Sequence, residues 1–242
     1  MNYGEILSFG AGVNSVALAI MAINDGWRGE IVFSDTGCEW PETYYYLDYF
    51  EREWLQPRGF KVKRIHQANY KNGLSLIEVC ERDHIIPLCA VRWCTVEYKV
   101  NPLELYAGEH STMLGIAADE AHRQDNAIRP LVEAGVTRDG CIDIIEVEGL
   151  DVPQRSGCYI CPFQRDSQWR MLWERHPKLF ERAMRLEENV KRGNSQRWNA
   201  TLDPKGKITL RQRLLSYESQ MELPEIDMDD LLRFKALGVM EL

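Results

Sequence analysis

The chain has 242 residues, of which 45% are hydrophobic and 27% are charged, so it is long enough to bury one sizeable core. Its formal net charge of −8 argues against wholesale non-specific binding to nucleic acid. No apolar run reaches about 18 residues and no basic stretch precedes the first one, so we expect neither a transmembrane helix nor a signal peptide. Seven cysteines, an odd number in a chain expected to be cytoplasmic, favour metal or redox chemistry over disulfides.

The first half of the chain alternates between short apolar runs and helical patterns. The apolar runs predict strands at residues 6–8, 31–34, 61–65, 113–116 and 143–145. Apolar residues at helical spacing predict helices at residues 15–24, 41–54 and 74–82. Such alternation produces right-handed βαβ units, so we expect an α/β fold with a parallel, doubly wound sheet of about five strands. Ligands of such sheets bind beyond the carboxyl ends of the strands.

The pattern changes after about residue 152. Helices are predicted at residues 167–175 and 177–192, followed by a polar, turn-rich segment and a short helix after Pro224. We therefore expect an α/β domain at residues 1–152. Residues 153–242 are expected to form a helical, cysteine-containing C-terminal region that packs on the ligand edge of the sheet.

A glycine-rich turn joins the first predicted strand to the first predicted helix. Backbone N–H groups at such a turn and at a helix start can bind an anion, and the helix dipole favours negative charge there. Gly10 and Gly12 let the backbone approach phosphate oxygens, and Ser8 and Ser15 add hydroxyl donors. The segment lacks the Gly-Lys-Ser/Thr of a Walker A loop, and Ser15 replaces the third glycine of a Rossmann fingerprint. An ordinary strand–turn–helix without a ligand is the alternative.

Several segments, in order, resemble the PP-loop ATP pyrophosphatase superfamily and its phosphoadenosine phosphosulfate (PAPS) reductase-like family. They are Ser8-Phe9-Gly10-Ala11 with Asn14-Ser15, Asp35-Thr36-Gly37 with Pro41-Glu42-Thr43, Arg92-Trp93-Cys94-Thr95 with Lys99, and Gly115-Ile116 with Asp119-Glu120 and Arg123. Cys158-Tyr159-Ile160-Cys161-Pro162-Phe163 is similar to the cysteine pair of the iron–sulfur members, including those that install sulfur in DNA backbones. The resemblance covers roughly residues 5–180, and it implies an adenine nucleotide alpha hydrolase-like fold.

The resemblance implies a site for ATP or a related adenine nucleotide together with Mg²⁺. The implied nucleotide-binding residues are Ser8, Phe9, Gly10, Ala11, Gly12, Asn14, Ser15, Asp35, Thr36, Gly37 and Glu42. The implied catalytic residues, which would neutralise phosphate or sulfate charge or bind magnesium, are Arg92, Lys99, Asp119, Glu120 and Arg123. An arginine fork matches two phosphate oxygens at once, and Mg²⁺ prefers carboxylates with phosphate oxygens. Taken singly, these side chains could instead cap loops or form surface ion pairs.

The cysteines indicate which branch of the superfamily this chain resembles. Cys158 and Cys161 have the spacing of a zinc or iron–sulfur ligand pair, and Cys94 and Cys89 are expected at the same edge of the sheet. Thiolate chemistry alone does not separate the two metals. A [4Fe–4S] cluster on Cys94, Cys158 and Cys161, with Cys89 as a candidate fourth ligand, is what the resemblance implies, and zinc is the alternative. Without a metal these residues would be buried, inert cysteines.

Two departures from the family shape the predicted function. The loop from Ser8 to Ser15 is two residues longer than the usual Ser-Gly-Gly-x-Asp-Ser, and Asn14 replaces the acid. No cysteine follows Cys161, so the reactive C-terminal thiol of PAPS reductases is missing. We therefore expect an ATP-dependent adenylating enzyme that activates an acceptor for sulfur or nitrogen transfer. The alternatives are a PAPS or adenosine phosphosulfate reductase that uses a partner thiol, and a non-catalytic nucleotide sensor subunit.

The expected partners are an adenine nucleotide, a nucleic-acid acceptor and a sulfur-donor protein, with no membrane. The basic residues that could follow a phosphate backbone are Arg165, Arg170, Arg175, Lys205, Lys207, Arg211 and Arg213. An ordinary solvated helix face is the other interpretation of these charges, and the acidic total favours it.

Overall fold

A parallel sheet of four strands, in the order β3-β2-β1-β4, lies at the centre of the protein. In this computed structural model the described residues are 1–66, 73–122, 127–192 and 201–220. The strands are β1 (Ile6–Ser8), β2 (Glu30–Asp35), β3 (Val62–His66) and β4 (Thr112–Leu114). All neighbouring strands are parallel, and Leu7 stands opposite both Ile31 and Met113. The predicted α/β fold with a parallel sheet is confirmed.

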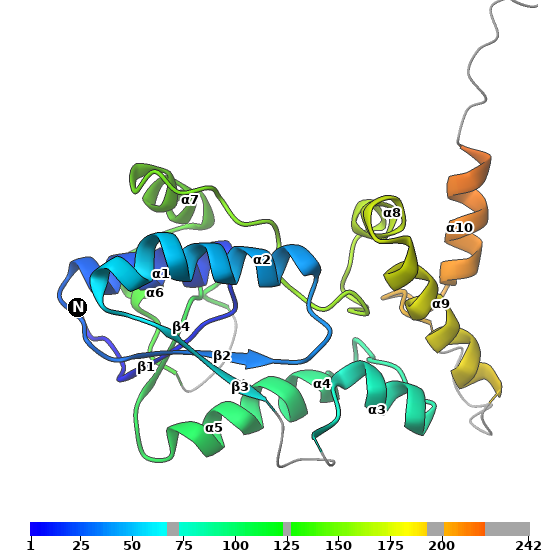
Figure 1. Ribbon diagram of the computed structural model, residues 1–242, viewed down its shortest axis with the longest axis horizontal. Coiled ribbons are helices and arrows are strands. Elements are labelled where there is room, and N and C mark those ends of the chain that lie inside the picture. Colours follow the sequence, from blue (N-terminus) through cyan, green and yellow to red (C-terminus); the bar gives the residue numbers. More distant parts are fainter. Residues whose placement is uncertain (67–72, 123–126, 193–200, 221–242) are drawn as a thin grey trace, which may run out of the picture.

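Helices cover both faces of the sheet (Figure 1). Helices α1 (Val13–Asn24) and α2 (Pro41–Phe50) lie on one face, and α5 (Asn101–Ala107) lies on the other. Because neighbouring strand residues point to opposite faces, Leu7 packs in the larger core under α1, whereas Ile6 packs with Leu103 of α5. Burial on both faces explains why residues 6–7 of β1 and 31–33 of β2 are continuously apolar, as is typical of parallel sheets.

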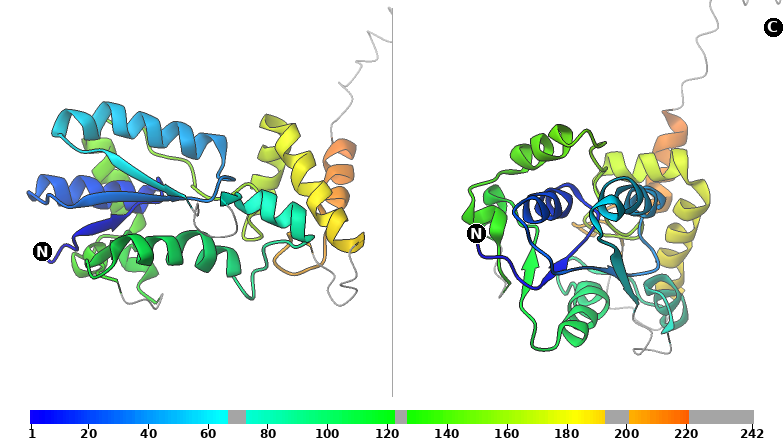
Figure 2. Two further views of the ribbon diagram at one scale, coloured as in Figure 1. Left: turned by 60° about the horizontal axis from the view of Figure 1, so that its bottom comes forward. Right: turned by 60° about the vertical axis from the view of Figure 1, so that its left-hand side comes forward.

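The remaining α-helices are α3 (Leu76–Asp83), α4 (Trp93–Thr95), α6 (Pro130–Glu133), α7 (Arg138–Val147), α8 (Asp166–Arg175), α9 (Pro177–Arg192) and α10 (Leu210–Ser219). Of these, α8, α9 and α10 lie together beyond one end of the sheet (Figure 2). The chain of α2 continues through a π-helical turn at Glu51–Leu55, close to the predicted helix end. None of the described helices combines the length and the apolar character needed to cross a membrane.

The predicted fifth strand at residues 143–145 is wrong, because these residues lie in α7. The hydroxyl of Thr137 caps this helix by accepting a hydrogen bond from the Gly140 N–H at 3.3 Å. Cys141 and Ile145, four positions apart on one helix face, are fully buried in the core that also contains α1. A short apolar run is ambiguous between strand and helix, and here the tertiary contact with α1 decides for the helix.

A second buried core joins the segment at residues 158–163, which we call the cysteine turn, to α3, α8, α9 and α10. It includes Trp40 and Val79 from the first half of the chain and Trp169, Phe180 and Tyr217 from the second half. Its residues therefore come from both sides of the predicted boundary at residue 152. The division of the chain into two domains at that point stays a prediction.

The thiol of Cys141 makes a pH-dependent contribution to the stability of the larger core, which contains α1 and which we call the first core. Burial raises the pKa of this thiol to about 11, although the nearby Arg138 opposes the rise. An unfolded thiol ionises near pH 8.5, roughly. Since the folded thiol keeps its proton longer, we expect this contribution to be present below about pH 9 and to be lost as the pH rises toward about 11. Urea unfolding at pH 8 and pH 10, compared between wild type and Cys141→Ala, measures it, and equal pH dependence in both proteins would contradict it.

Candidate functional site

The loop after β1 is folded around the hydroxyl of Ser15. This oxygen accepts hydrogen bonds from the backbone N–H groups of Gly10 at 3.3 Å and Gly12 at 3.2 Å, and it donates to the Gly12 carbonyl at 3.0 Å. The sequence led us to expect the Gly10 and Gly12 amides to be free for an anion, but both form hydrogen bonds within the loop. At the start of α1, the N–H groups of Val13 and Asn14 have no hydrogen-bond partner among the described residues. The anion-binding capacity therefore lies at the helix start.

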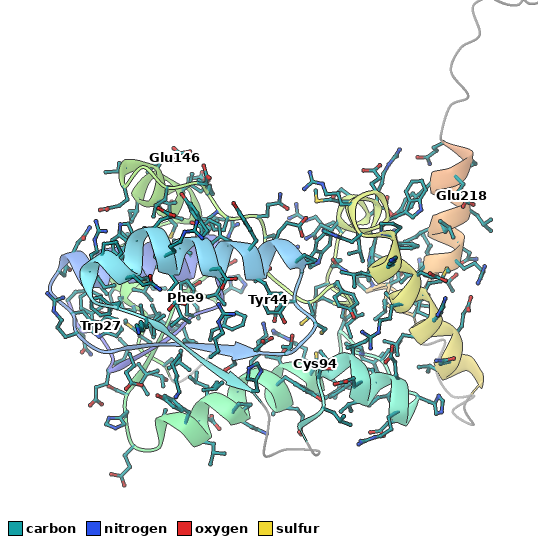
Figure 3. The ribbon with its side chains drawn as sticks, in the orientation of Figure 1. Phe9, Trp27, Tyr44, Cys94, Glu146 and Glu218 are labelled. Atoms are coloured by element: carbon teal, nitrogen blue, oxygen red, sulfur yellow. The ribbon has the colours of Figure 1, made fainter. Side chains whose placement is uncertain are left out.

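The loop opens on a cavity of about 370 Å³, which we call the loop cavity. Its lining residues come from the carboxyl ends of β1 and β4 and from more distant segments: Ser8, Gly10, Gly12, Val13, Asn14, Ser15, Leu114, Gly115, Ile116, Glu120, Arg138, Arg155 and Ser156. The other two predicted loop residues contribute no side chain to this cavity, since Phe9 and Ala11 pack in the first core. Figure 3 shows Phe9 beneath the helical layer, where its ring stacks on Phe50.

Glycine is required at two places around the loop cavity. A Cβ atom on Gly115 would lie 2.7 Å from the backbone nitrogen of Ser15, so β4 can approach the start of α1 only without a side chain. A Cβ atom on Gly12 would lie 2.6 Å from the hydroxyl of Ser156. By contrast, a Cβ atom on Gly10 would meet nothing within 4 Å. The space above Gly10 is therefore open to a ligand.

Asn14 lies between opposite charges in the loop cavity. Its side-chain amide donates to a Glu120 carboxylate oxygen at 3.5 Å, and its amide oxygen accepts from the Arg138 guanidinium at 3.3 Å. An aspartate could accept from Arg138 but could not donate to Glu120. The replacement of the family's acid by asparagine therefore fits these neighbours. Asp119 lies close by, because its carboxylate accepts the Arg138 backbone N–H at 3.1 Å.

The structure adds Arg138 and Arg155 to the predicted site residues. Arg138 is the first residue of α7, where the helix dipole disfavours a positive charge, so its position was a signal for an anion.

Of the cations that the sequence predicted, those that the structure describes do not line the loop cavity. Arg92 lies over the ring of Phe163, with 5.5 Å between its guanidinium carbon and the ring centroid. Arg123 lies outside the described residues.

The predicted nucleotide-binding residues after β2 have partners of their own. The Asp35 carboxylate accepts the Gly37 N–H at 2.8 Å and the Tyr44 hydroxyl at 2.6 Å. Glu42 lies 2.9 Å from the His176 ring and so joins α2 to the start of α9. These contacts hold the loop after β2 in shape. A role of these residues in nucleotide binding stays a prediction.

A group of thiols, which we call the thiol cluster, gathers where the cysteine turn meets the loop after β2. It contains Cys38, Cys80, Cys94, Cys158 and Cys161. Burial raises the pKa of the Cys161 thiol to about 11, and nearby negative charge on Cys158 and Cys94 adds to the rise. Burial also raises the pKa of Cys94, and Cys158 again adds to it. Cys38, Cys80, Cys94 and Cys158 pack in the second core, although they come from four parts of the sequence.

Direct contacts tie the cysteine turn to the loop after β2. The Thr36 hydroxyl lies 3.2 Å from the Cys158 sulfur and donates to Glu39 at 3.1 Å. The backbone N–H of Tyr159 donates to the Cys38 carbonyl at 2.9 Å. The Thr36 hydroxyl is thus directed at sulfur rather than at the loop cavity.

The predicted metal ligands are not arranged as a set. Burial raises the pKa of the Cys89 thiol, and the charge of Asp203 adds to the rise. Among the described residues, no group of three or more His, Cys, Asp or Glu side chains is placed to hold a metal ion. Cys94, Cys158 and Cys161 have the donor chemistry for iron or zinc, but their side chains would have to rotate toward a common centre.

An ion pair between a buried carboxylate and a partly exposed ammonium lies beside the thiol cluster. The Lys99 ammonium is 2.9 Å from the Glu39 carboxylate, which is almost fully buried. Burial disfavours the ammonium charge, but Glu39 and Cys158 outweigh this effect and raise the pKa of Lys99. A permanent positive charge therefore lies next to the sulfur atoms, where it would stabilise an anion.

Most of the predicted basic surface is neutralised by ion pairs. Arg170 pairs with Glu174, Arg175 with Glu42, Arg211 with Glu188, and Arg213 with Asp166 and Asp203. Three of these arginines pair within the C-terminal region, and Arg175 pairs with a residue of α2. Their pairing supports the interpretation as an ordinary helix surface.

Comparison with known proteins gives only distant similarities. No family model matches the chain. Two uncharacterised proteins of Methanocaldococcus jannaschii are similar, one 24% identical over 75% of this chain and 47% of that protein, the other 22% identical over 80% and 42%. The chain thus spans about half the length of the curated relatives it matches.

Two solved structures are similar to this one. Phosphoadenylyl-sulfate (PAPS) reductase from Candida auris has a TM-score of 0.46 and 14% identity, over 65% of this chain and 82% of that chain. The U34-tRNA thiolase NcsA from Methanococcus maripaludis, solved with its [4Fe–4S] cluster, has a TM-score of 0.45 and 13% identity, over 93% and 83%. At these scores neither protein assigns an activity to this chain.

Proposed function

We propose that this chain is an enzyme that binds ATP or a related adenine nucleotide in the loop cavity and adenylates an acceptor. The observation that carries the proposal is the position of two sites at one edge of the sheet. The loop after β1 forms the loop cavity, and the loop after β2 contacts the thiol cluster through Thr36 and Cys38. A nucleotide and a sulfur atom could therefore be brought to one acceptor.

The proposed reaction has two steps. An acceptor oxygen attacks the α-phosphorus of ATP, and pyrophosphate leaves with the bonding electron pair. A sulfur or nitrogen nucleophile then displaces AMP from the activated carbon. The free N–H groups at the start of α1 and the Arg138 guanidinium would bind the phosphates, and Asp119 and Glu120 would bind Mg²⁺. Lys99 would stabilise the anionic nucleophile beside the thiol cluster.

We further propose that Cys94, Cys158 and Cys161 hold a [4Fe–4S] cluster. Their mutual proximity and the positive charge of Lys99 support thiolate ligation in this region. When bound, the cluster would carry or position the sulfur for transfer. A sulfur-donor protein is the implied partner.

Calorimetry with a non-hydrolysable ATP analogue tests the nucleotide site. In the Gly12→Val protein the new side chain collides with the Ser156 hydroxyl, 2.6 Å from the Cβ position, and closes the loop cavity. We expect the affinity to fall by about tenfold or more, since charge-assisted bonds to phosphate are lost. The Gly12→Val, Ser156→Ala double variant should recover part of it. Equal affinity of wild type and Gly12→Val would remove the loop from the mechanism.

The activity itself separates the alternatives. Pyrophosphate release from ATP that depends on an acceptor would support adenylation. Sulfite release from PAPS in the presence of a dithiol would indicate a reductase instead. Binding of the nucleotide without turnover of either substrate would indicate a sensor subunit.

A further inference from the structure

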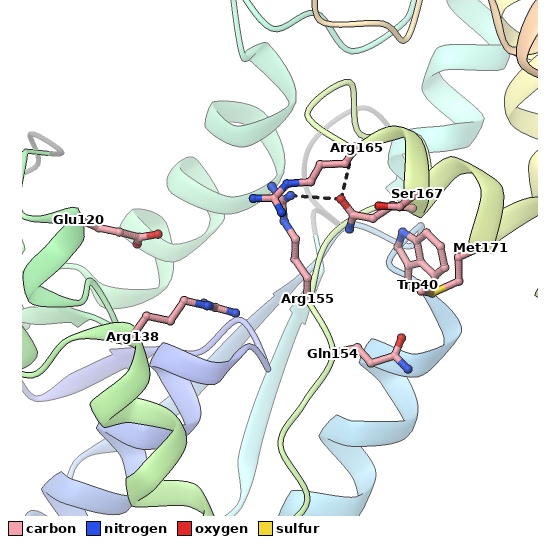
Figure 4. Close-up of a pocket in the computed structure, with 9 residues that line it drawn as sticks. Trp40, Glu120, Arg138, Gln154, Arg155, Arg165, Ser167 and Met171 are labelled. Carbon is pink, nitrogen blue, oxygen red and sulfur yellow. Dashed lines mark hydrogen bonds between the residues drawn. The ribbon is translucent and has the colours of Figure 1, made fainter.

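A second cavity, of about 590 Å³, lies between the loop cavity and the start of α8. We call it the arginine cavity, because Arg138, Arg155 and Arg165 line it (Figure 4). Arg138, Arg155 and Glu120 also line the loop cavity, so the two cavities adjoin. Arg165 lines only the arginine cavity.

The three arginines of this cavity differ from most others in the chain. Within the part of the chain that the structure describes, none of them forms an ion pair with a carboxylate. Arg138 and Arg155 donate instead to neutral amide oxygens, of Asn14 at 3.3 Å and of Gln168 at 3.1 Å. Figure 4 shows Arg155 and Arg165 reaching toward one another. Like charges held together in one concavity repel, and a bound anion would relieve this repulsion.

The remaining lining of the arginine cavity fits an organic phosphate better than a bare ion. Helix α8, of ten residues, begins at this cavity, so its dipole adds to the attraction for an anion. The amides of Gln154 and Gln168 can hydrogen-bond to a base or a sugar, and Trp40 and Met171 supply an apolar wall. The volume lies within the range of small-molecule sites. A nucleotide-sized ligand satisfies all of these features.

We propose that the arginine cavity binds a second phosphate-bearing ligand of nucleotide size beside the nucleotide of the loop cavity. The role of this second ligand as the acceptor rests on the proposed function, whereas its binding in the arginine cavity does not. The shared chemistry is a nucleoside phosphate, which is either free or one unit of a nucleic-acid strand. Arginine forks would hold the phosphate, and the glutamine amides would contact the nucleoside.

Fluorescence titration with two probes, cytidine 5′-monophosphate and a labelled single-stranded 12-mer, tests the proposal on protein saturated with the ATP analogue. In Arg165→Gln protein we expect both probes to bind about tenfold more weakly. Ser167→Asp should weaken probe binding likewise, although an acid in the first turn of α8 favours the helix. Arg185→Gln on α9 removes the same charge from a side chain outside the cavity and should change neither affinity.

The outcomes separate the two sources of the ligand. If Arg165→Gln weakens the binding of the monophosphate alone, the ligand is a free nucleotide. If the 12-mer binds more tightly than the monophosphate and the monophosphate displaces it, the ligand is a nucleic-acid strand. Failure of both probes to bind the loaded protein, or equal effects of Arg165→Gln and Arg185→Gln, would overturn the proposal. If wild type did not bind the ATP analogue, the proposed function would fail. Probe binding that depended on Arg165 in the unloaded protein would then still support the arginine cavity.

Discussion

Wild-type protein purified without oxygen is expected to be brown and to contain iron and acid-labile sulfide in about equal amounts, as a cubane cluster requires. Changing Cys158 or Cys161 to serine should abolish the colour and the iron. Both residues lie in the thiol cluster, and a serine hydroxyl is a poor ligand for this metal. Iron analysis and the visible spectrum measure the effect.

Cys141→Ser is the matched control for the cluster prediction. Cys141 is buried in the first core, whereas Cys158 packs in the second core, so the iron content should stay at the wild-type level. Colourless wild-type protein that contained zinc would contradict the iron–sulfur proposal and leave a structural metal site. Protein without any metal would make these cysteines core residues and favour the functions that need no sulfur.

Gly115→Ala is expected to disable the nucleotide site and to destabilise the fold. The added methyl would lie 2.7 Å from the Ser15 nitrogen and 2.9 Å from the Asn14 carbonyl carbon, and both are backbone atoms that cannot rotate away. Overpacking of this kind costs about 1–3 kcal/mol of unfolding free energy. Displacement of the α1 start should lower affinity for the ATP analogue by about tenfold or more, because the phosphate-binding N–H groups move.

Urea unfolding and calorimetry check this prediction together. Gly10→Ala serves as the control for stability, since its methyl would meet no atom within 4 Å. Its unfolding free energy should match wild type. Wild-type affinity and stability in Gly115→Ala would show that β4 and the start of α1 can separate without consequence.

The sequence was informative about the fold where local pattern and tertiary environment agree. The apolar runs predicted as strands at residues 6–8 and 31–34 lie in the parallel strands β1 (Ile6–Ser8) and β2 (Glu30–Asp35). Helix α5 was missed because Asn101–Ala107 is short and because Pro102, which lies in its first turn, is a common signal for a loop. The error at residues 143–145 arose because contact with α1, which lies far away in the chain, decides that segment.

The candidate site was predictable in position but not in its interactions. Strand, glycine turn and helix start located the loop, yet nothing local indicates that Ser15 would occupy the amides of Gly10 and Gly12. Arg138 lies 124 positions from the Asn14 that it contacts, and no motif joins them. Long-range pairs of this kind are set by packing, which single-sequence patterns do not contain.

The composition of the second core has a consequence for biosynthesis. This core needs Tyr98 from the first half of the chain and Tyr217 near the end of α10. At about 5–20 residues per second, the intervening residues take roughly 6 to 24 s to be added. Until α8, α9 and α10 have all been added, the apolar faces of α3 and of the segment around Tyr98 are not fully covered. A holdase-type chaperone that binds the nascent chain would therefore be expected to engage this stretch, and to leave when α8, α9 and α10 emerge.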